Sequence, residues 1–250
     1  MIRFFVSTKD IDGGIARLSA DDAAHLRSLR LRPSETFIVC DGEGSDHVCR
    51  LAERDGGGPS GRDEGAPLAE VIETRPSLGE PSVSCSVYIA YAAGDRLDFA
   101  VQKSVELGAR EVFLYPSHRC EAMPRDPVKK IARLQRVSLE TAKQCARGIV
   151  PQVTAVGSFN GAVGLAARAG LPLFLYECEE TLHLKQALEN AERSGAVSIM
   201  TGPVGGFEPF EAEYANTAGM VTVTLGARIL RCETAPVAAL AAVMFHTDNL

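Results

Sequence analysis

From residue 82 onward, short apolar runs alternate with segments that have the composition of helices. The expected strands are 83–92, 111–115, 171–177, 197–201 and 221–225, and the expected helices are 95–107, 127–147, 182–193, 209–217 and 234–245. Such an alternation predicts a mostly parallel sheet with helices on both faces. We therefore expect one α/β domain at residues 82–250.

Residues 1–75 show a different pattern, in which short apolar runs are separated by turns. Strands are expected at 2–7, 37–40, 48–51 and 68–74, with one short helix at 21–31 capped by Ser19. Residues 54–67 are rich in glycine and charge, so we expect a flexible loop there. A small β-rich domain at 1–75 is therefore expected, followed by a linker at 75–81.

Neither a membrane span nor a metal centre is expected. No apolar run approaches the roughly 18 residues that a span needs, and the start of the chain lacks the features of a signal peptide. The seven cysteines never form a C-x-x-C spacing, and the five histidines are scattered. We therefore expect a soluble, cytoplasmic protein with reduced cysteines and no metal site.

Two glycine-containing segments follow expected strands and precede expected helices. The first is Thr201–Phe207, with the sequence TGPVGGF, whose glycines allow a ligand to approach the backbone. It is not G-x-G-x-x-G, so a dinucleotide site is not supported. An ordinary strand-to-helix turn is the alternative reading of the same segment.

The second segment is Leu225–Ala235, with the sequence LGARILRCETA. Ile229 and Leu230 could pack on a flat apolar group. Arg228 and Arg231 lie near a helix N-terminus, where the helix dipole favours acids rather than bases. These arginines indicate an anionic ligand such as RNA phosphate, with solvated surface arginines as the alternative.

The formal net charge is −6, yet the region 117–147 holds eight basic and three acidic residues. Five of the basic residues recur at helical spacing on the face opposite Val128, Ile131, Leu134 and Cys145: Lys129, Arg133, Arg136, Lys143 and Arg147. RNA responds to a local patch rather than to the total charge. This face is therefore a candidate RNA-binding surface, although any exposed helix carries charges.

At several separate places the chain resembles the RsmE family of SPOUT RNA methyltransferases. The matching segments are Arg3–Val6, His25–Arg30, Asp41–Gly42, Gln102–Gly108, Ser117–Cys120, the positions Glu140, Gln144, Arg147 and Pro151, and the two segments Gly202–Phe207 and Leu225–Ala235. The resemblance covers nearly the whole chain apart from 54–67.

The resemblance implies a PUA-like β-barrel at 1–75 and a SPOUT α/β domain with a C-terminal trefoil knot at 82–250. It also implies a homodimer formed through the knot domain. The implied activity is methylation of N3 of a uridine in 16S ribosomal RNA, either free or in the small ribosomal subunit, with S-adenosyl-L-methionine as the methyl donor. Another SPOUT activity, such as ribose methylation of tRNA, is an alternative that the Arg-Ile-Leu-Arg-x-Glu-Thr segment disfavours.

The resemblance also implies the residues of the site. Those implied to bind the cofactor are Leu175, Tyr176, Glu177, Thr201, Gly202, Val204, Gly205, Gly206, Leu225, Gly226, Ile229, Leu230, Arg231, Thr234 and Ala235. The expected RNA-binding residues are Arg3, Arg27, Arg30, Lys103, Arg119, Lys129, Arg133, Arg136, Lys143 and Arg147.

The candidate catalytic residues are Arg228, Arg231 and Glu233. The uridine N3 carries a proton, so cations that stabilise its anion assist methyl transfer. Glu233 is a candidate proton acceptor through water, or otherwise a helix cap. Arg119 or Arg147 of a partner subunit could complete the site.

Two positions depart from the family pattern. Val204 replaces an acid that the family carries in its Gly-Pro-Glu-Gly-Gly motif, and Ala227 replaces a proline. The loss of the acid leaves open a third hypothesis, an RNA-binding assembly factor with a weakened cofactor site.

Overall fold

The computed structural model describes residues 2–32, 34–52, 68–121, 123–191 and 195–250. The chain forms two compact units, one of residues 1–80 and 142–150 and the other of residues 81–141 and 151–250. The boundary near residue 80 lies in the expected linker. Residues 142–150, which the sequence pattern places in the second domain, belong to the first unit. The expected loop at 54–67 lies outside the described residues.

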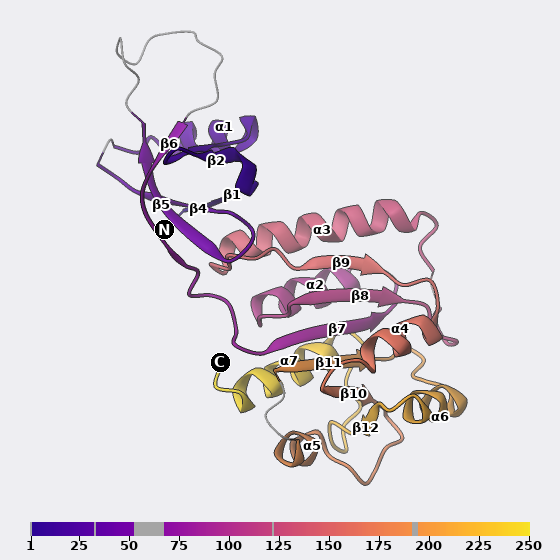
Figure 1. The fold of residues 1–250 in the computed structure, drawn as a ribbon. Coiled ribbons are helices and arrows are strands. Elements are labelled where there is room, and N and C mark those ends of the chain that lie inside the picture. The colour runs from indigo at the N-terminus through magenta and orange to yellow at the C-terminus, as the bar shows by residue number, and fades with distance from the viewer. Residues whose placement is uncertain (1, 33, 53–67, 122, 192–194) are drawn as a thin grey trace. The chain divides into compact units, whose positions relative to one another are not determined.

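The second unit is built on a sheet of six parallel strands. They are β7 (Ser84–Ala90), β8 (Glu111–Tyr115), β9 (Gln152–Ala155), β10 (Leu171–Leu175), β11 (Ala196–Thr201) and β12 (Val221–Val223). Their order across the sheet is β12-β10-β11-β7-β8-β9, and every neighbouring pair is parallel (Figure 1). The prediction of a mostly parallel sheet is confirmed.

Helices cover both faces of this sheet (Figure 1). They are α2 (Arg96–Glu106), α3 (Pro127–Gln144), α4 (Phe159–Ala166), α5 (Leu184–Asn190), α6 (Pro209–Thr217) and α7 (Thr234–His246). On one face, Tyr88 and Ala90 of β7 share a core cluster with side chains of α4. On the other face, α7 contacts β7, β11 and α2. Because side chains alternate along a strand, Val87 and Ile89 are buried on this second face.

Local sequence signals explain where α3 begins and ends. The Asp126 carboxylate accepts a hydrogen bond from the Lys129 backbone N–H at 3.0 Å, which caps the helix as expected. The helix ends at Gln144 rather than at the expected Arg147, because Ala146 adopts a left-handed φ of 63°. Val128, expected on the apolar face, is 80% exposed, whereas Leu134 is buried.

The strand β9 and the helix α4 are absent from the sequence prediction. The α4 segment contains Gly161 and Gly164, which lower its helix propensity. Tertiary packing of Ala162 and Val163 against the sheet outweighs that cost. The side-chain amide of Gln135 in α3 pairs with Pro151 and Val153 at the start of β9, with distances of 3.1 and 2.8 Å.

The first unit contains a curled sheet of mixed direction and one helix. Its elements are β1 (Arg3–Phe5), a 3-10 turn at Thr8–Asp10, β2 (Ile11–Asp12), β3 (Ile15–Arg17), α1 (Ala20–Ser28), β4 (Phe37–Cys40), β5 (Ser45–Leu51) and β6 (Leu68–Pro76). The strand order is β1-β4-β5-β6-β3-β2, and only β1–β4 is parallel among these described pairs. Ser19 caps α1 as predicted, accepting the Asp22 N–H at 3.1 Å. Phe4, Leu26 and Phe37 lie in its core.

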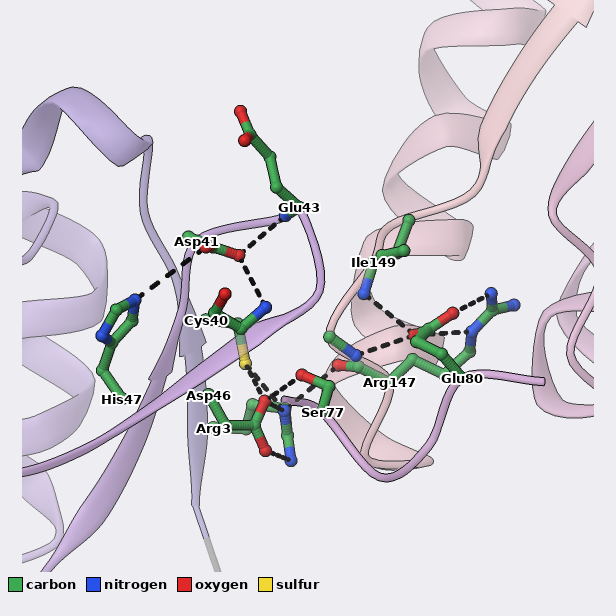
Figure 2. Close-up of polar contacts among 12 residues, drawn as sticks. Arg3, Cys40, Asp41, Glu43, Asp46, His47, Ser77, Glu80, Arg147 and Ile149 are labelled. Atoms are coloured by element: carbon green, nitrogen blue, oxygen red, sulfur yellow. Dashed lines mark hydrogen bonds and ion pairs between the residues drawn. The ribbon is translucent and has the colours of Figure 1, made fainter. Parts of the chain in front are cut away.

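Two buried ion pairs stabilise this unit (Figure 2). Arg3 donates to Asp46 at 2.8 Å, and the Ser77 hydroxyl donates to the same carboxylate. Arg147, which is 2% exposed, donates to Glu80 at 2.7 Å. Arg3 and Arg147 were both expected to bind RNA. Their guanidinium groups are instead used inside the unit, because an unpaired buried charge is too costly to retain.

Glu80 holds the segment that follows α3. Its Oε1 accepts the backbone N–H groups of Gly148 and Ile149 at 2.9 and 3.0 Å (Figure 2). These contacts explain why residues 142–150 belong to the first unit. No described helix of either unit is long and apolar enough to cross a membrane.

Candidate functional site

A cavity of about 990 Å³ lies at the carboxyl ends of β10, β11 and β12. It is lined by residues of three loops, 175–177, 201–206 and 223–233, together with Arg96 and a few neighbouring side chains. Ligands of open parallel sheets bind at this edge. The position of the cavity therefore makes it the candidate ligand site of the second unit.

The cavity brings together most of the residues that the sequence singles out for cofactor binding. Those that line it are Leu175, Tyr176, Glu177, Thr201, Gly202, Val204, Gly205, Gly206, Leu225, Gly226, Ile229, Leu230, Arg231 and Ala235. Arg228 and Glu233 line it as well, so the three candidate catalytic residues meet here. Thr234 begins α7 and is not one of the lining residues.

The glycine-rich loop after β11 is shaped by its contact with Glu177. Gly206 adopts a φ of +70° and closes a turn onto Pro203 at 3.0 Å. A Cβ atom at Gly206 would overlap the Glu177 carboxylate. That carboxylate accepts the Phe207 N–H at 2.9 Å. Glycine at position 206 therefore suits both the positive φ and the close approach of the Glu177 carboxylate, which holds the loop from the segment after β10.

Arg119 holds the same loop from the other side. Its Nη1 donates to the Gly205 carbonyl at 3.1 Å, while Nε and Nη2 each donate to the Glu208 carboxylate at 2.8 Å. The hydrogen bonds from Arg119 hold the pKa of Glu208 below its usual value. Its guanidinium supports the loop within its own chain, and the expected RNA binding by Arg119 stays a prediction.

Glu211 positions the segment that carries Arg119. This carboxylate is 1% exposed and accepts hydrogen bonds from the Ser117 hydroxyl at 2.9 Å and the His118 N–H at 3.0 Å. Neither Glu208 nor Glu211 is among the residues predicted from the sequence. The available signal was the sequence Glu208-Pro209-Phe210-Glu211 at the start of α6, in which an acid follows three residues after an acidic N-cap.

The loop after β12 presents its side chains to the cavity. Gly226 has a φ of +103°, and the Arg231 carbonyl accepts the N–H groups of Thr234 and Ala235 at 2.8 and 2.9 Å, which starts α7. Between these points Ile229 is 84% exposed. An exposed isoleucine on a cavity wall is suited to packing against a flat ligand group.

Glu233 does not cap α7, which was one of its two predicted roles. It stands at the N-cap position without a side-chain cap hydrogen bond. Its carboxylate accepts the Cys232 thiol at 3.2 Å and lies 3.8 Å from the Arg96 guanidinium. Arg96 is not among the residues predicted from the sequence. A basic residue at the start of a helix, the pattern that singled out Arg228 and Arg231, was the available signal.

These neighbours fix the protonation states. Burial alone would raise the pKa of Glu233, but hydrogen bonds from its own N–H and from Cys232, with the charges of Arg96 and Arg231, leave the pKa below its usual value. Burial and the bond to Glu233 raise the pKa of Cys232 to about 11. At neutral pH, Glu233 is therefore ionised and a weak base, and Cys232 is a neutral thiol.

The remaining basic residues divide between the two units. On α3, Lys129 and Arg136 are exposed, and Arg133 pairs with Asp98 at 3.1 Å while staying 61% exposed. Lys103 pairs with Glu106 within α2 at 2.8 Å. In the first unit, Arg27 and Arg30 are exposed, and Lys143 pairs with Asp22 at 3.2 Å. Within the described residues, no cluster of histidine, cysteine and acidic side chains could hold a metal ion.

Residues 79–244 match the RNA methyltransferase domain family. Ribosomal RNA small subunit methyltransferase E of Mesomycoplasma hyopneumoniae is 27% identical over 95% of this chain and 96% of its own length. The protein of the same name from Bacillus subtilis is 27% identical over 93% and 91%.

A solved structure extends the likeness to the whole fold. Ribosomal RNA small subunit methyltransferase E from Neisseria gonorrhoeae, bound to S-adenosyl methionine, matches with a TM-score of 0.82 and 32% identity. The match covers 98% of this chain and 97% of that one. With its parallel sheet and the cavity at the sheet's carboxyl edge, this chain belongs to the RNA methyltransferase domain family and, within it, to the ribosomal RNA small subunit methyltransferase E group.

Proposed function

We propose that this protein transfers a methyl group from S-adenosyl-L-methionine to N3 of a uridine in 16S ribosomal RNA. The cavity that three loops form at the carboxyl ends of β10, β11 and β12 carries the proposal. Relatives that match nearly the whole chain are named as small-subunit ribosomal RNA methyltransferases. The structurally similar methyltransferase E of Neisseria gonorrhoeae is bound to S-adenosyl methionine.

The residues that line the cavity fit this methyl donor. Gly202, Gly205 and Gly226 line the cavity without a side chain, so a ligand can approach the main chain there, as recognition of an adenosine by main-chain atoms requires. Ile229 and Leu230 offer an apolar surface for a base. When bound, S-adenosyl-L-methionine supplies a methyl group that its positive sulfonium activates for in-line displacement. The protein's part is to place the nucleophile in line with that methyl group.

The exposed arginines of the cavity suit the second substrate. Uridine N3 becomes a good nucleophile once its proton leaves, and the resulting negative charge spreads over the ring. Arg228 and Arg231 line the cavity and can stabilise that charge. Since Glu233 is a weak base, we assign the rate gain to this charge stabilisation, with the N3 proton passing to water.

Three further features of the family belong to the same proposal. The first unit acts as a PUA-like RNA-binding domain, the second carries a trefoil knot, and two copies form a homodimer through it. The knot is proposed from the family likeness. In keeping with it, Thr224 exchanges backbone hydrogen bonds with Leu182 and Leu184, so the end of β12 lies beside the segment that follows β10. Light scattering should give twice the 26.7 kDa of one chain.

Mass spectrometry of ribosomal RNA tests the activity. A deletion strain should lose one methylated uridine in 16S RNA, and the purified protein with S-adenosyl-L-methionine should restore it on small subunits from that strain. An unchanged methylation pattern in the deletion strain would reject the proposed reaction.

Val204 favours one alternative, an assembly factor with a weakened cofactor site. Its side chain is apolar and 46% exposed on the cavity wall. If the missing acid matters, Val204→Glu should raise cofactor affinity or methylation rate by a few-fold. Calorimetry with S-adenosyl-L-methionine decides the alternative, because a decayed site gives no binding to the native protein.

A further inference from the structure

Arg96 lines the cavity, and the hydrogen-bond donors of its guanidinium group are not used by the described residues. Its side chain is 42% exposed, and its one ion pair, to Glu233, spans 3.8 Å. That distance is too long for a hydrogen bond. The Arg96 guanidinium makes no hydrogen bond to any residue that the structure describes. Five N–H donors therefore face solvent or the cavity.

The acids and the arginines of the cavity lie mostly on different segments, apart from Glu233, which lies on the same loop as Arg228 and Arg231. The loop after β10 contributes three acids, Glu177, Glu179 and Glu180. Arg96, at the start of α2, and the loop after β12 contribute three arginines, Arg96, Arg228 and Arg231. The acids suit a methyl donor that carries a sulfonium and an ammonium group. The arginines suit the other substrate of the proposed reaction, which is a polyanion.

We propose that Arg96 binds a phosphate of the RNA beside the target nucleotide. The inference rests on the proposed function and adds a residue to its substrate contacts. A guanidinium recognises phosphate oxygens through paired hydrogen bonds. Glu233 keeps Arg96 at the cavity without occupying its donors, so the RNA gains the contact without breaking a hydrogen bond. Arg96 is partly exposed, as a contact to a macromolecule requires.

A salt series with three variants tests this assignment. Unmodified small-subunit ribosomal RNA is the probe, and the variants are Arg96→Gln, Arg96→Lys and the control Arg110→Gln. Arg110 is exposed before the amino end of β8, at the opposite edge of the sheet. A lost phosphate contact should reduce the slope of log affinity against log salt by about 0.7 to 0.9 in Arg96→Gln.

Two further measurements separate RNA binding from cofactor binding. Arg96→Gln should raise the KM for RNA about tenfold and leave the Kd for S-adenosyl-L-methionine unchanged. Arg96→Lys should keep the salt slope because lysine retains the charge. Arg110→Gln should match the parent in every measurement.

Two results would overturn the assignment. One is an unchanged salt slope in a folded Arg96→Gln protein. The other is a weaker Kd for S-adenosyl-L-methionine with RNA binding intact, which would place the cofactor carboxylate on Arg96. Failure of the proposed function is distinct, because the parent protein would then fail to methylate the RNA.

Discussion

Three hydrogen bonds from one guanidinium hold the glycine-rich loop in place. Arg119 contacts the Gly205 carbonyl and both oxygens of Glu208, and its side chain is 41% exposed. An exposed ion pair contributes little to the free energy of unfolding. Arg119 nonetheless fixes the position of the Gly205 carbonyl on the cavity wall.

We therefore expect Arg119→Gln to weaken cofactor binding more than it weakens the fold. The Kd for S-adenosyl-L-methionine should rise about tenfold by calorimetry, as for the loss of a charged hydrogen bond, while the melting temperature changes little. Arg168→Gln is the matched control, since Arg168 is an exposed arginine after α4 and lines none of the cavity. Equal cofactor affinity in both variants would show that the loop holds its shape without Arg119.

Single residues also mark the limit of what sequence alone could predict. Arg119, Arg147 and Lys129 all belong to one basic stretch, and charge patterning gave them one role. The structure places Lys129 on the surface, Arg119 against a carbonyl and Arg147 in a buried pair with Glu80. Arg147 and its partner Glu80 are 67 residues apart in the sequence, and Arg119 and its partner Glu208 are 89 residues apart. No local pattern encodes such distant contacts.

Among the elements, the turn after β11 is the one most constrained by geometry. Gly206 combines a positive φ with a Cβ direction that the Glu177 carboxylate fills. Any side chain there must move both the turn and Glu177. Since Glu177 also binds the Phe207 N–H, the disturbance reaches the entire loop.

Gly206→Ala should accordingly lower cofactor affinity by at least tenfold and destabilise the protein by about 1–2 kcal/mol. Gly164→Ala is the control, because this helical glycine has an ordinary φ and open space around it. It should stabilise the protein by about 0.5–1 kcal/mol through its higher helix propensity. Urea unfolding and calorimetry measure both effects, and similar behaviour of the two variants would contradict the role given to Glu177.

Elements with clear start and stop residues were predicted well, and short elements without such residues were missed. The helix at 209–217 begins with Pro209 and has the predicted bounds. By contrast, β9 has four residues and the β2–β3 hairpin pairs only two residues of each strand, so neither gives a clear periodic signal. Pairing with β8 and β6 stabilises these strands, which is a tertiary effect.

For the molecule as a whole, the alternation of strands and helices was enough to predict a parallel sheet with a site at its carboxyl edge. It could not predict that residues 142–150 join the first unit. That assignment depends on Glu80, which binds both Arg147 and the backbone after α3. The sequence around Glu80 does not indicate that it binds this segment, because its partners Arg147, Gly148 and Ile149 are far from it in the sequence.

Buried acids that stay ionised make the stability of the first unit depend on pH. Burial alone would raise the pKa of Asp46, but its hydrogen bonds from Arg3 and Ser77 and the charge of Arg3 lower it. An acid whose folded pKa is depressed contributes stability above its unfolded pKa, about 3.9 for aspartate. That contribution is lost as the pH falls through the folded pKa.

We therefore expect the free energy of unfolding to fall steeply below about pH 4, and Asp46→Asn to remove part of that dependence. The variant should also lose about 3 kcal/mol at neutral pH, since Arg3 stays buried without its counter-charge. Urea unfolding at a series of pH values measures both effects. Asp12→Asn serves as control, because Asp12 is exposed and should leave the curve unchanged. If Asp46→Asn keeps the full acid dependence, the Arg3–Asp46 pair is not its source.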